Sequence, residues 1–428
     1  MDNELQAIQD ADRALVRVAR DLKVLSAIAW PPQMAEAFLT GWRAGQPTLP
    51  EPPPVTLQFD DRLPELERLA RPVSDHPMAH FVARTAHSYE LAARMIGKAG
   101  TADFTALSIE LYGRPDDPVT PGGLTNLAAA DNLVNATDEL GRAGLIDERD
   151  YCLLPSYVRD EIQRRFDAFF TDRPVAVTMD ETLTAKAAAG ASAIRLRTAV
   201  CFSYSDIEQL VNHEGLVHTA TLINGRRQPI LTCMGMSTPR TTATQEGLAT
   251  FAELITNSMD LARLRRLALR IQGIDAALGG ADFIEVFRLF LDSGQTETES
   301  YFSTARVFRG GDPRGSIAFT KDIVYLRGLL RTQAYFLAAL ESRKVQFAGY
   351  LFSGRLTWGD VLELEPYFES KLVAPARYVP PWLSSLDRLA AHLAFSSLTH
   401  HFPVHDTRLE HFHSPALRTE ELADEHTS

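Results

Sequence analysis

The chain has 428 residues, of which 45% are hydrophobic and 23% are charged. This composition is typical of globular proteins and excludes disordered and fibrous classes. The formal net charge of −12, together with the lack of a basic stripe, argues against a nucleic-acid partner. No uncharged apolar window of about 18 residues is present, so we expect no membrane-spanning helix.

The N-terminal part of the chain is predicted to be helical. Apolar residues recur at helical spacing over residues 4–43, with a break at the Trp-Pro-Pro sequence of residues 30–32. The proline-dense stretch 46–54 favours extended geometry and predicts a surface arm or spacer. Helical patterns follow at 77–99 and up to residue 140. We therefore predict a helical region over 1–140 that packs on the remainder of the chain.

Two features bear on the cellular compartment. The acidic start of the chain lacks the basic and apolar segments of a secretory signal. Cys152, Cys201 and Cys233 are far apart and form no Cys-x-x-Cys pair, which indicates neither a disulfide framework nor a thiolate metal site. We expect a soluble protein of the reducing cytoplasm.

The hydrophobic period changes in the middle of the chain. Around 175–179 and 194–203, β-branched residues and alternating arginines predict strands of a small antiparallel sheet. Helical patterning returns downstream, which makes the predicted fold class mainly α (α+β). The helical segments are 206–222, 244–257, 261–271, 282–291 and 320–342, with one more helix ending near 396.

The most informative segment is His213-Glu214-Gly215-Leu216-Val217-His218. In the familiar zinc motif two histidines stand four residues apart on one helix face. Five residues of a regular α-helix instead turn the second imidazole by about 140° from the first, which would prevent chelation. A π-type turn restores a common face, and such turns concentrate at functional sites. We therefore predict a widened turn or a local helix break between His213 and His218, eased by Gly215.

A hydrolytic zinc site needs three protein ligands and an open position, and the third ligand is often a carboxylate. Glu246 lies at the start of the next helical run and is our candidate for that ligand. Glu214 is adjacent to a ligand but is not one itself. We predict that it is the general base that accepts the proton of the attacking water and later passes it to the leaving amine.

These residues resemble a family of zinc peptidases known by its Gln-Glu-Gly-Leu-Ala motif, present here at residues 245–249. The family includes eukaryotic tyrosine carboxypeptidases that act on microtubules, and bacterial members. Similar stretches at 25–31, 111–113 and 319–328 extend the resemblance over roughly 15–345. Residues 215–217 depart from the usual family pattern. The resemblance implies the same ligand set, zinc as cofactor and a peptide or protein C-terminal tail as substrate.

A carboxypeptidase must neutralise the terminal carboxylate of its substrate, which calls for Arg or Lys near the metal. Downstream of the motif, Arg306, Arg309, Lys321 and Arg327 are the candidates for this role. Tyr325 is the candidate donor to the developing oxyanion. Arg195 and Arg197 lie on a predicted strand that either borders the substrate cleft or is an ordinary edge strand.

The sequence as a whole predicts a carboxypeptidase-like zinc metallopeptidase built around a catalytic domain at 141–375, and leaves the choice between exopeptidase and endopeptidase open. A C-terminal part at 376–428 adds one helix and a tail with five histidines, which we interpret as partly ordered rather than as a second metal site. Two alternatives stay open at this stage. One is a zinc hydrolase of a small non-peptide amide, and the other is a non-catalytic metal-binding or regulatory helical protein. The histidines of the tail are His400, His401, His405, His411 and His413.

Overall fold

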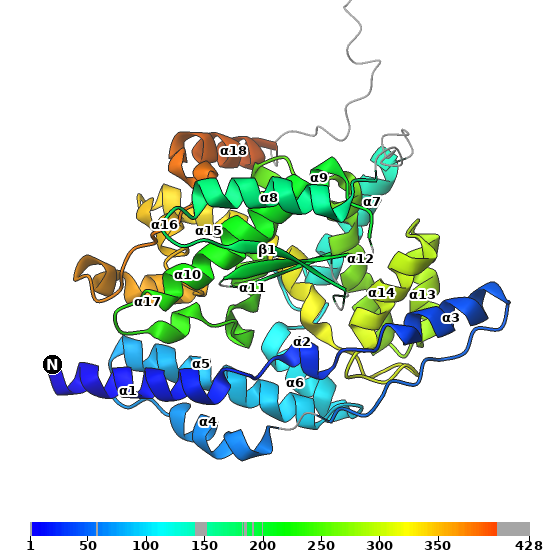
Figure 1. Ribbon diagram of the computed structural model, residues 1–428, viewed down its shortest axis with the longest axis horizontal. Coiled ribbons are helices and arrows are strands. Elements are labelled where there is room, and N and C mark those ends of the chain that lie inside the picture. The colour runs from blue at the N-terminus through cyan, green and yellow to red at the C-terminus, as the bar shows by residue number, and fades with distance from the viewer. Residues whose placement is uncertain are drawn as a thin grey trace, which may run out of the picture.

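Helices from the two ends of the chain enclose the central segment that carries the candidate metal ligands (Figure 1). The structure is a computed structural model that describes residues 2–56, 59–141, 152–181, 183, 186–190, 192–198 and 200–399. The five tail histidines therefore lie outside the described residues. The N-terminal helices are α1 (Asp2–Ala19), α2 (Val24–Ala27), α3 (Gln33–Arg43), α4 (Leu63–Leu69), α5 (Pro77–Gly97), α6 (Ala102–Tyr112) and α7 (Asn126–Gly141), with the short 3-10 turn η1 (Asp60–Arg62) before α4.

A small sheet follows α8 (Pro155–Phe169). The described strands β1 (Ala176–Asp180), β2 (Ala187–Ala189) and β3 (Ala193–Arg197) pair in the order β1-β3-β2. The mainly helical fold class is confirmed, but the sheet is mixed rather than wholly antiparallel. β2 and β3 form an antiparallel hairpin, and β3 thereby enters between β2 and β1 and runs parallel to β1.

The helices after the sheet supply the walls of the candidate site. Several of them begin at a side-chain cap, for example at Ser203, which forms a capping box with Asp206 at the beginning of α9. These elements are α9 (Tyr204–Leu210), the π-helix η2 (Val211–Thr219), α10 (Ala220–Arg226), η3 (Thr232–Gly235), η4 (Pro239–Thr241), α11 (Thr242–Ile255), α12 (Leu261–Leu278), α13 (Phe283–Asp292), α14 (Glu297–Phe308), η5 (Thr320–Asp322), α15 (Ile323–Glu341), α16 (Gln346–Tyr350), α17 (Trp358–Glu369), η6 (Pro381–Ser384) and α18 (Leu386–Thr399).

The hydrophobic core joins distant parts of the chain. One cluster contains Ile8 of α1, Phe251 of α11 and Leu393 of α18. A separate cluster packs α8 and the sheet against the π-helix, with Phe166 among its fully buried members. The division into parts at 1–140, 141–375 and 376–428 stays a prediction. Among the described helices, none has both the length and the apolar character needed to cross a membrane.

The cysteine prediction requires a correction. Cys152 and Cys201 are joined by a disulfide between the segment before α8 and the segment before α9. A backbone bridge between Leu153 and Phe202 lies next to this disulfide. The pairing spans 49 residues of sequence, so the spacing of the cysteines gave no sign of it. Cys233 is buried and free.

Candidate metal centre

The helix that carries both histidines is widened, as their spacing predicts. Val211–Thr219 is a π-helix that continues α9 and passes into α10. Because π-helical hydrogen bonds join residues five apart, His213 and His218 lie one above the other on the same face. Gly215 is needed at this place, since a Cβ atom there would lie 2.3 Å from the ring of Phe166 on α8. The two imidazoles are buried and face the next helix.

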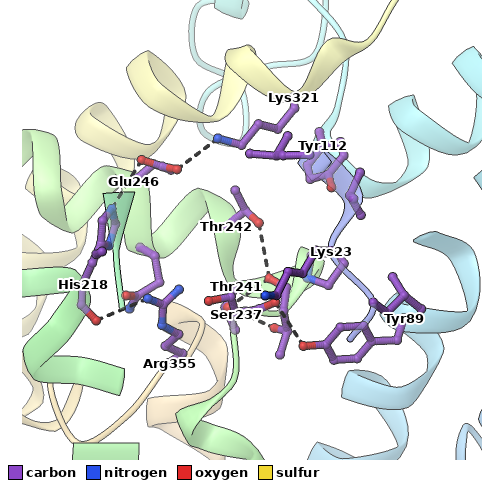
Figure 2. Close-up of a pocket in the computed structure, with 17 residues that line it drawn as sticks. Lys23, Tyr89, Tyr112, His218, Ser237, Thr241, Thr242, Glu246, Lys321 and Arg355 are labelled. Atoms are coloured by element: carbon purple, nitrogen blue, oxygen red, sulfur yellow. Dashed lines mark hydrogen bonds and ion pairs between the residues drawn. The ribbon is translucent and has the colours of Figure 1, made fainter. Parts of the chain in front are cut away.

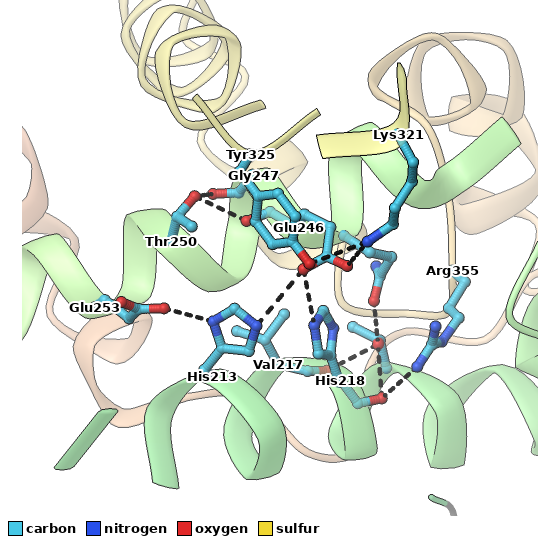
Figure 3. A network of polar contacts seen from close by, with 12 residues as sticks. His213, Val217, His218, Glu246, Gly247, Thr250, Glu253, Lys321, Tyr325 and Arg355 are labelled. Atoms are coloured by element: carbon cyan, nitrogen blue, oxygen red, sulfur yellow. Dashed lines mark hydrogen bonds and ion pairs between the residues drawn. The ribbon is translucent and has the colours of Figure 1, made fainter. Parts of the chain in front are cut away.

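Glu246 reaches the two imidazoles from α11 (Figure 3). Its Oε2 atom lies 3.6 Å from Nε2 of His213 and 3.6 Å from Nε2 of His218. One ligand atom from each of these residues lies within 4.8 Å of the others. The structure therefore brings together all three residues that the sequence predicted as ligands.

The remainder of the Gln-Glu-Gly-Leu-Ala sequence explains how Glu246 is placed. A Cβ atom at Gly247 would lie 2.3 Å from the carbonyl oxygen of Gly328, so α11 and α15 approach each other closely at this point. Leu248 and Ala249 are fully buried in the core. Gln245 accepts a hydrogen bond of 2.8 Å from Thr221 of α10. The position of Glu246 on α11 is thus fixed by the packing of α11 on α15 and by the hydrogen bond from α10, which continues the helix that carries the histidines.

His213 has a second carboxylate behind it. Its Nδ1 atom lies 2.6 Å from Oε1 of Glu253, which is fully buried on α11. Arg263 donates to both carboxylate oxygens of Glu253, each at 3.1 Å. Burial alone would raise the pKa of Glu253, but Arg263 and His213 lower it to about 2. An ionised acceptor at Nδ1 fixes the imidazole orientation and leaves Nε2 toward Glu246.

Sequence analysis did not identify Glu253, although one signal was available. Glu253 stands seven residues after Glu246 on the same helix, which is about two turns and hence the same face. An acidic residue at that position can reach a metal-binding histidine of a neighbouring helix. For His218 the situation differs, because its Nδ1 atom is buried without a hydrogen-bond partner in the described part of the chain.

Two of the predicted residues, Lys321 and Tyr325, lie beside Glu246. Lys321 Nζ is 3.0 Å from Glu246 Oε1 and donates to the hydroxyl of Tyr325, also at 3.0 Å. Burial alone would lower the pKa of Lys321, but Glu246 and Tyr325 raise it above its ordinary value, so the ammonium group persists. Lys321 therefore occupies the Glu246 oxygen that is turned away from the histidines.

Arg306 extends this network away from the cavity. It donates to Oδ1 of Asp322 at 2.8 Å and contacts the hydroxyl of Tyr325 at 3.4 Å. Arg270 lies 3.6 Å from Asp322 on the same side. Burial alone would raise the pKa of Asp322, but Arg306 and Arg270 hold it well below its ordinary value. Arg306 thus has a counter-ion of its own.

The other two predicted basic residues do not line the cavity described below. Arg309 packs over the ring of Phe319, with 5.3 Å between its guanidinium carbon and the ring centroid. Arg327 lies against Gly113 and is 3.9 Å from Asp117. Arg195 of β3 is paired with Asp180 of β1 at 2.8 Å. Their proximity in sequence to the motif did not translate into a place at the cavity.

Glu214 lies within the π-helix directly after His213 and is partly buried. Its negative charge acts on both His213 and Arg355. It does not line the cavity described below. Its role as general base stays a prediction.

A cavity of about 340 Å³ opens beside the candidate ligands. His218, Glu246 and Lys321 form one side of it, and Arg355 adjoins His218 (Figure 2). Hydroxyl groups from the segment 237–242 and the rings of Tyr89 and Tyr112 complete the lining. Sequence analysis missed Arg355, because no motif surrounds it and 137 residues separate it from His218.

The residues present fit a divalent transition-metal ion. Two imidazole nitrogens and one carboxylate oxygen are the donor set of hydrolytic zinc sites. Both Nε2 atoms face one oxygen of Glu246, and Nδ1 of His213 is bonded to Glu253, so the two Nε2 atoms and this oxygen are the atoms that would hold a cation. The open side of the group leads to the cavity.

A model of the family described as microtubule-associated tyrosine carboxypeptidase matches residues 36–401 of the chain. No curated protein matches it. The matched segment contains every residue of the candidate metal centre.

Proposed function

Since the chain belongs to the microtubule-associated tyrosine carboxypeptidase family, we propose that it is a zinc enzyme that removes the C-terminal residue of a peptide or protein tail. Its family makes it a carboxypeptidase of the metallopeptidase class. The identity of the ion, the substrate and the roles of individual residues are the proposal. The observation that carries it is the convergence of His213, His218 and Glu246 at the edge of a cavity.

His213 Nε2, His218 Nε2 and Glu246 Oε2 would hold the zinc ion. When bound, zinc supplies a Lewis acid that polarises the scissile carbonyl and makes water more acidic. A carboxylate of Glu214 takes the proton of the attacking water and delivers it to the nitrogen of the leaving residue. The Glu253 carboxylate keeps the His213 ring in place while this proton moves.

Tyr325 is our candidate for stabilising the negative oxygen that develops on the scissile carbonyl. Its hydroxyl accepts a hydrogen bond from Lys321, so its own proton is free to point elsewhere. Burial and Glu246 favour the neutral phenol, whereas Lys321 and Arg306 lower the pKa of Tyr325 below its ordinary value. A more acidic phenol is a stronger hydrogen-bond donor to an oxyanion.

The test combines metal analysis with peptide cleavage. We expect purified protein to contain one zinc ion per chain and to release the last residue from tyrosine-ended peptides, as measured by mass spectrometry. Glu214→Gln should retain zinc and lower the cleavage rate about 10²- to 10⁴-fold, because only the proton acceptor is removed. Glu208→Gln, an exposed position on the preceding helix α9, is the matched control and should behave as the wild type.

Two results would contradict the proposal. One is a purified protein that neither contains zinc nor gains it after dialysis against the metal. The other is a Glu214→Gln variant that cleaves as fast as the wild type. Cleavage inside the peptide rather than at its end would retain the metal site but reject the carboxypeptidase assignment.

A further inference from the structure

We propose that Arg355 and the side-chain amide of Gln245 hold the free α-carboxylate of the substrate's terminal residue, an inference that rests on the proposed carboxypeptidase function. Both side chains line the cavity next to the candidate metal ligands. Neither was expected to bind substrate from the sequence. The assignment replaces the basic residues that sequence proximity to the motif had favoured.

The position of Arg355 is rigid. It lies in a fully buried turn between α16 and α17, and its backbone N–H donates to the carbonyl oxygen of Met234 at 2.7 Å. Asn224 and Gln228, which follow the π-helix, donate to the carbonyl oxygens of Phe352 and Ser353 at 2.8 Å each. The segment that follows His218 therefore fixes the turn that carries Arg355.

The guanidinium group of Arg355 lacks a negative partner. The residue is only 9% exposed, and Nη2 donates to the carbonyl oxygen of His218 at 3.2 Å. Nε is buried without a hydrogen-bond partner, and no acidic side chain of the described chain forms an ion pair with it. A buried cation of this kind is stabilised when an anion enters the cavity.

Gln245 presents a second unused donor to the same space. It is 2% exposed, and its Oε1 is taken by the hydroxyl of Thr221. Its Nε2 is buried with no partner among the described residues. A buried donor without a partner is costly, and a ligand with acceptor oxygens in this cavity would supply a partner to both of these donors. A carboxylate has two such oxygens and carries the charge that Arg355 lacks.

The other cations near the cavity are less suited to this role. Lys321 is engaged with Glu246 and Tyr325. Lys23 lines the cavity but is exposed, so water screens its charge. Arg355 also contacts the backbone of His218 itself, which places its charge beside a candidate metal ligand. In the substrate, the α-carboxylate belongs to the residue that directly follows the scissile carbonyl.

The experiment compares peptides that end in a free carboxylate with the same peptides ending in an amide. We expect the wild type to prefer the free acid, and Arg355→Met to lose about 10- to 100-fold of that preference, the loss appearing as a higher KM for the acid. Zinc content should be unchanged. Gln245→Met should show a smaller loss in the same direction. Arg327→Met, at a partly buried arginine that does not line the cavity, is the matched control and should retain the preference.

A binding measurement separates this inference from the proposed function. Calorimetric titration of the Glu214→Gln protein with N-acetyltyrosine and with its amide should show tighter binding of the acid. The same titrations of Glu214→Gln combined with Arg355→Met should show no difference, and Arg355→Lys in place of Arg355→Met should retain part of it. These titrations do not require turnover, and repeating them after removal of zinc excludes binding of the acid to the metal.

The inference is overturned if the acid preference survives Arg355→Met, or if Arg327→Met abolishes it. A wild-type protein without peptidase activity would instead reject the proposed function, and the titrations would still decide whether Arg355 binds a carboxylate. Circular dichroism of each variant identifies loss of folding, and the Arg355→Lys variant then carries the comparison.

Discussion

The side chains beside the cavity fall into two sets that differ in how their charges are matched, and we call them the matched side, around Glu246, and the unmatched side, made of Arg355 and Gln245. On the side of Glu246, the buried cations have anionic partners: Lys321 contacts Glu246, Arg263 contacts Glu253, and Arg306 contacts Asp322. On the side of Arg355, the guanidinium and the Gln245 amide both keep donors without partners in the described chain. The first side is arranged before anything binds, whereas the second is completed only by a ligand. Substrate binding and metal binding should therefore respond separately to mutation.

The largest expected effect is on the matched side. Glu246→Ala removes the carboxylate ligand and leaves Lys321 without its counter-ion. We expect zinc to be lost and peptide cleavage to fall to background, as measured by metal analysis and product release. A Glu246→Ala protein that keeps both zinc and activity would show that the matched side is not the metal-binding side.

The next effect concerns stability. Asp322→Asn leaves Arg306 and Arg270 buried without their shared carboxylate, and loss of one partner of a buried pair costs about 3–5 kcal/mol. Chemical denaturation at neutral pH measures this loss. Asp103→Asn, in an exposed pair with Lys98, is the control and should cost about 1 kcal/mol or less.

The pH dependence of the same variant sharpens the test. The pKa of Asp322 is lower in the folded protein than its ordinary value, so the folded state binds fewer protons at this site. Its stabilisation is present above the ordinary carboxyl pKa and is lost as the pH falls through the folded pKa. The unfolding free energy of Asp322→Asn should therefore decline less than that of the wild type below about pH 4. Parallel declines would contradict the ion-pair assignment.

A smaller effect is expected where α11 meets α15. Gly247→Ala places a methyl group 2.3 Å from the carbonyl oxygen of Gly328, and such overpacking costs about 1–3 kcal/mol. Because Glu246 is the adjacent residue, zinc affinity should fall as well. Gly97→Ala, at a helical glycine with open space around it, should instead leave stability unchanged or raise it slightly.

The smallest expected effect concerns the support of a ligand. Glu253→Gln keeps the shape of the side chain but removes the charge that orients His213. Changes of this kind cost about 10- to 100-fold in metal affinity, which competition with a chelator measures. Arg355→Met should leave this affinity unchanged, because Arg355 contacts the backbone carbonyl oxygen of His218 and no ligand atom. Equal loss in both variants would erase the distinction between the two sides.

The sequence predicted the centre of the site better than its surroundings. The five-residue spacing of His213 and His218 predicted the widened helix, and the Gln-Glu-Gly-Leu-Ala sequence predicted Glu246. Both signals are local in the sequence. Two histidines five residues apart can share one helix face only if the helix is widened there. Lys321 and Tyr325 lie at the site, but Lys321 faces Glu246, and the role of substrate binding passes in our proposal to Arg355.

The features that the sequence missed depend on long-range packing. Arg355 reaches the site because Asn224 and Gln228 hold the turn that carries it. The hydrophobic periodicity of a sequence does not predict contacts of this kind. The disulfide of Cys152 with Cys201 and the parallel pairing of β1 with β3 are of the same kind. Arg309 and Arg327 show the converse, since the need for a basic residue near the metal favoured them and the fold does not bring them to the cavity.

The π-helix also has a consequence for the evolution and redesign of this protein. A chain that loses one residue between Glu214 and His218 arrives at the four-residue histidine spacing, which an ordinary α-helix presents on one face. A single codon deletion could therefore connect two zinc-binding helices that appear unrelated when their sequences are aligned without gaps. The ring of Phe166 packs on Gly215, so its packing would change first when the helix is shortened.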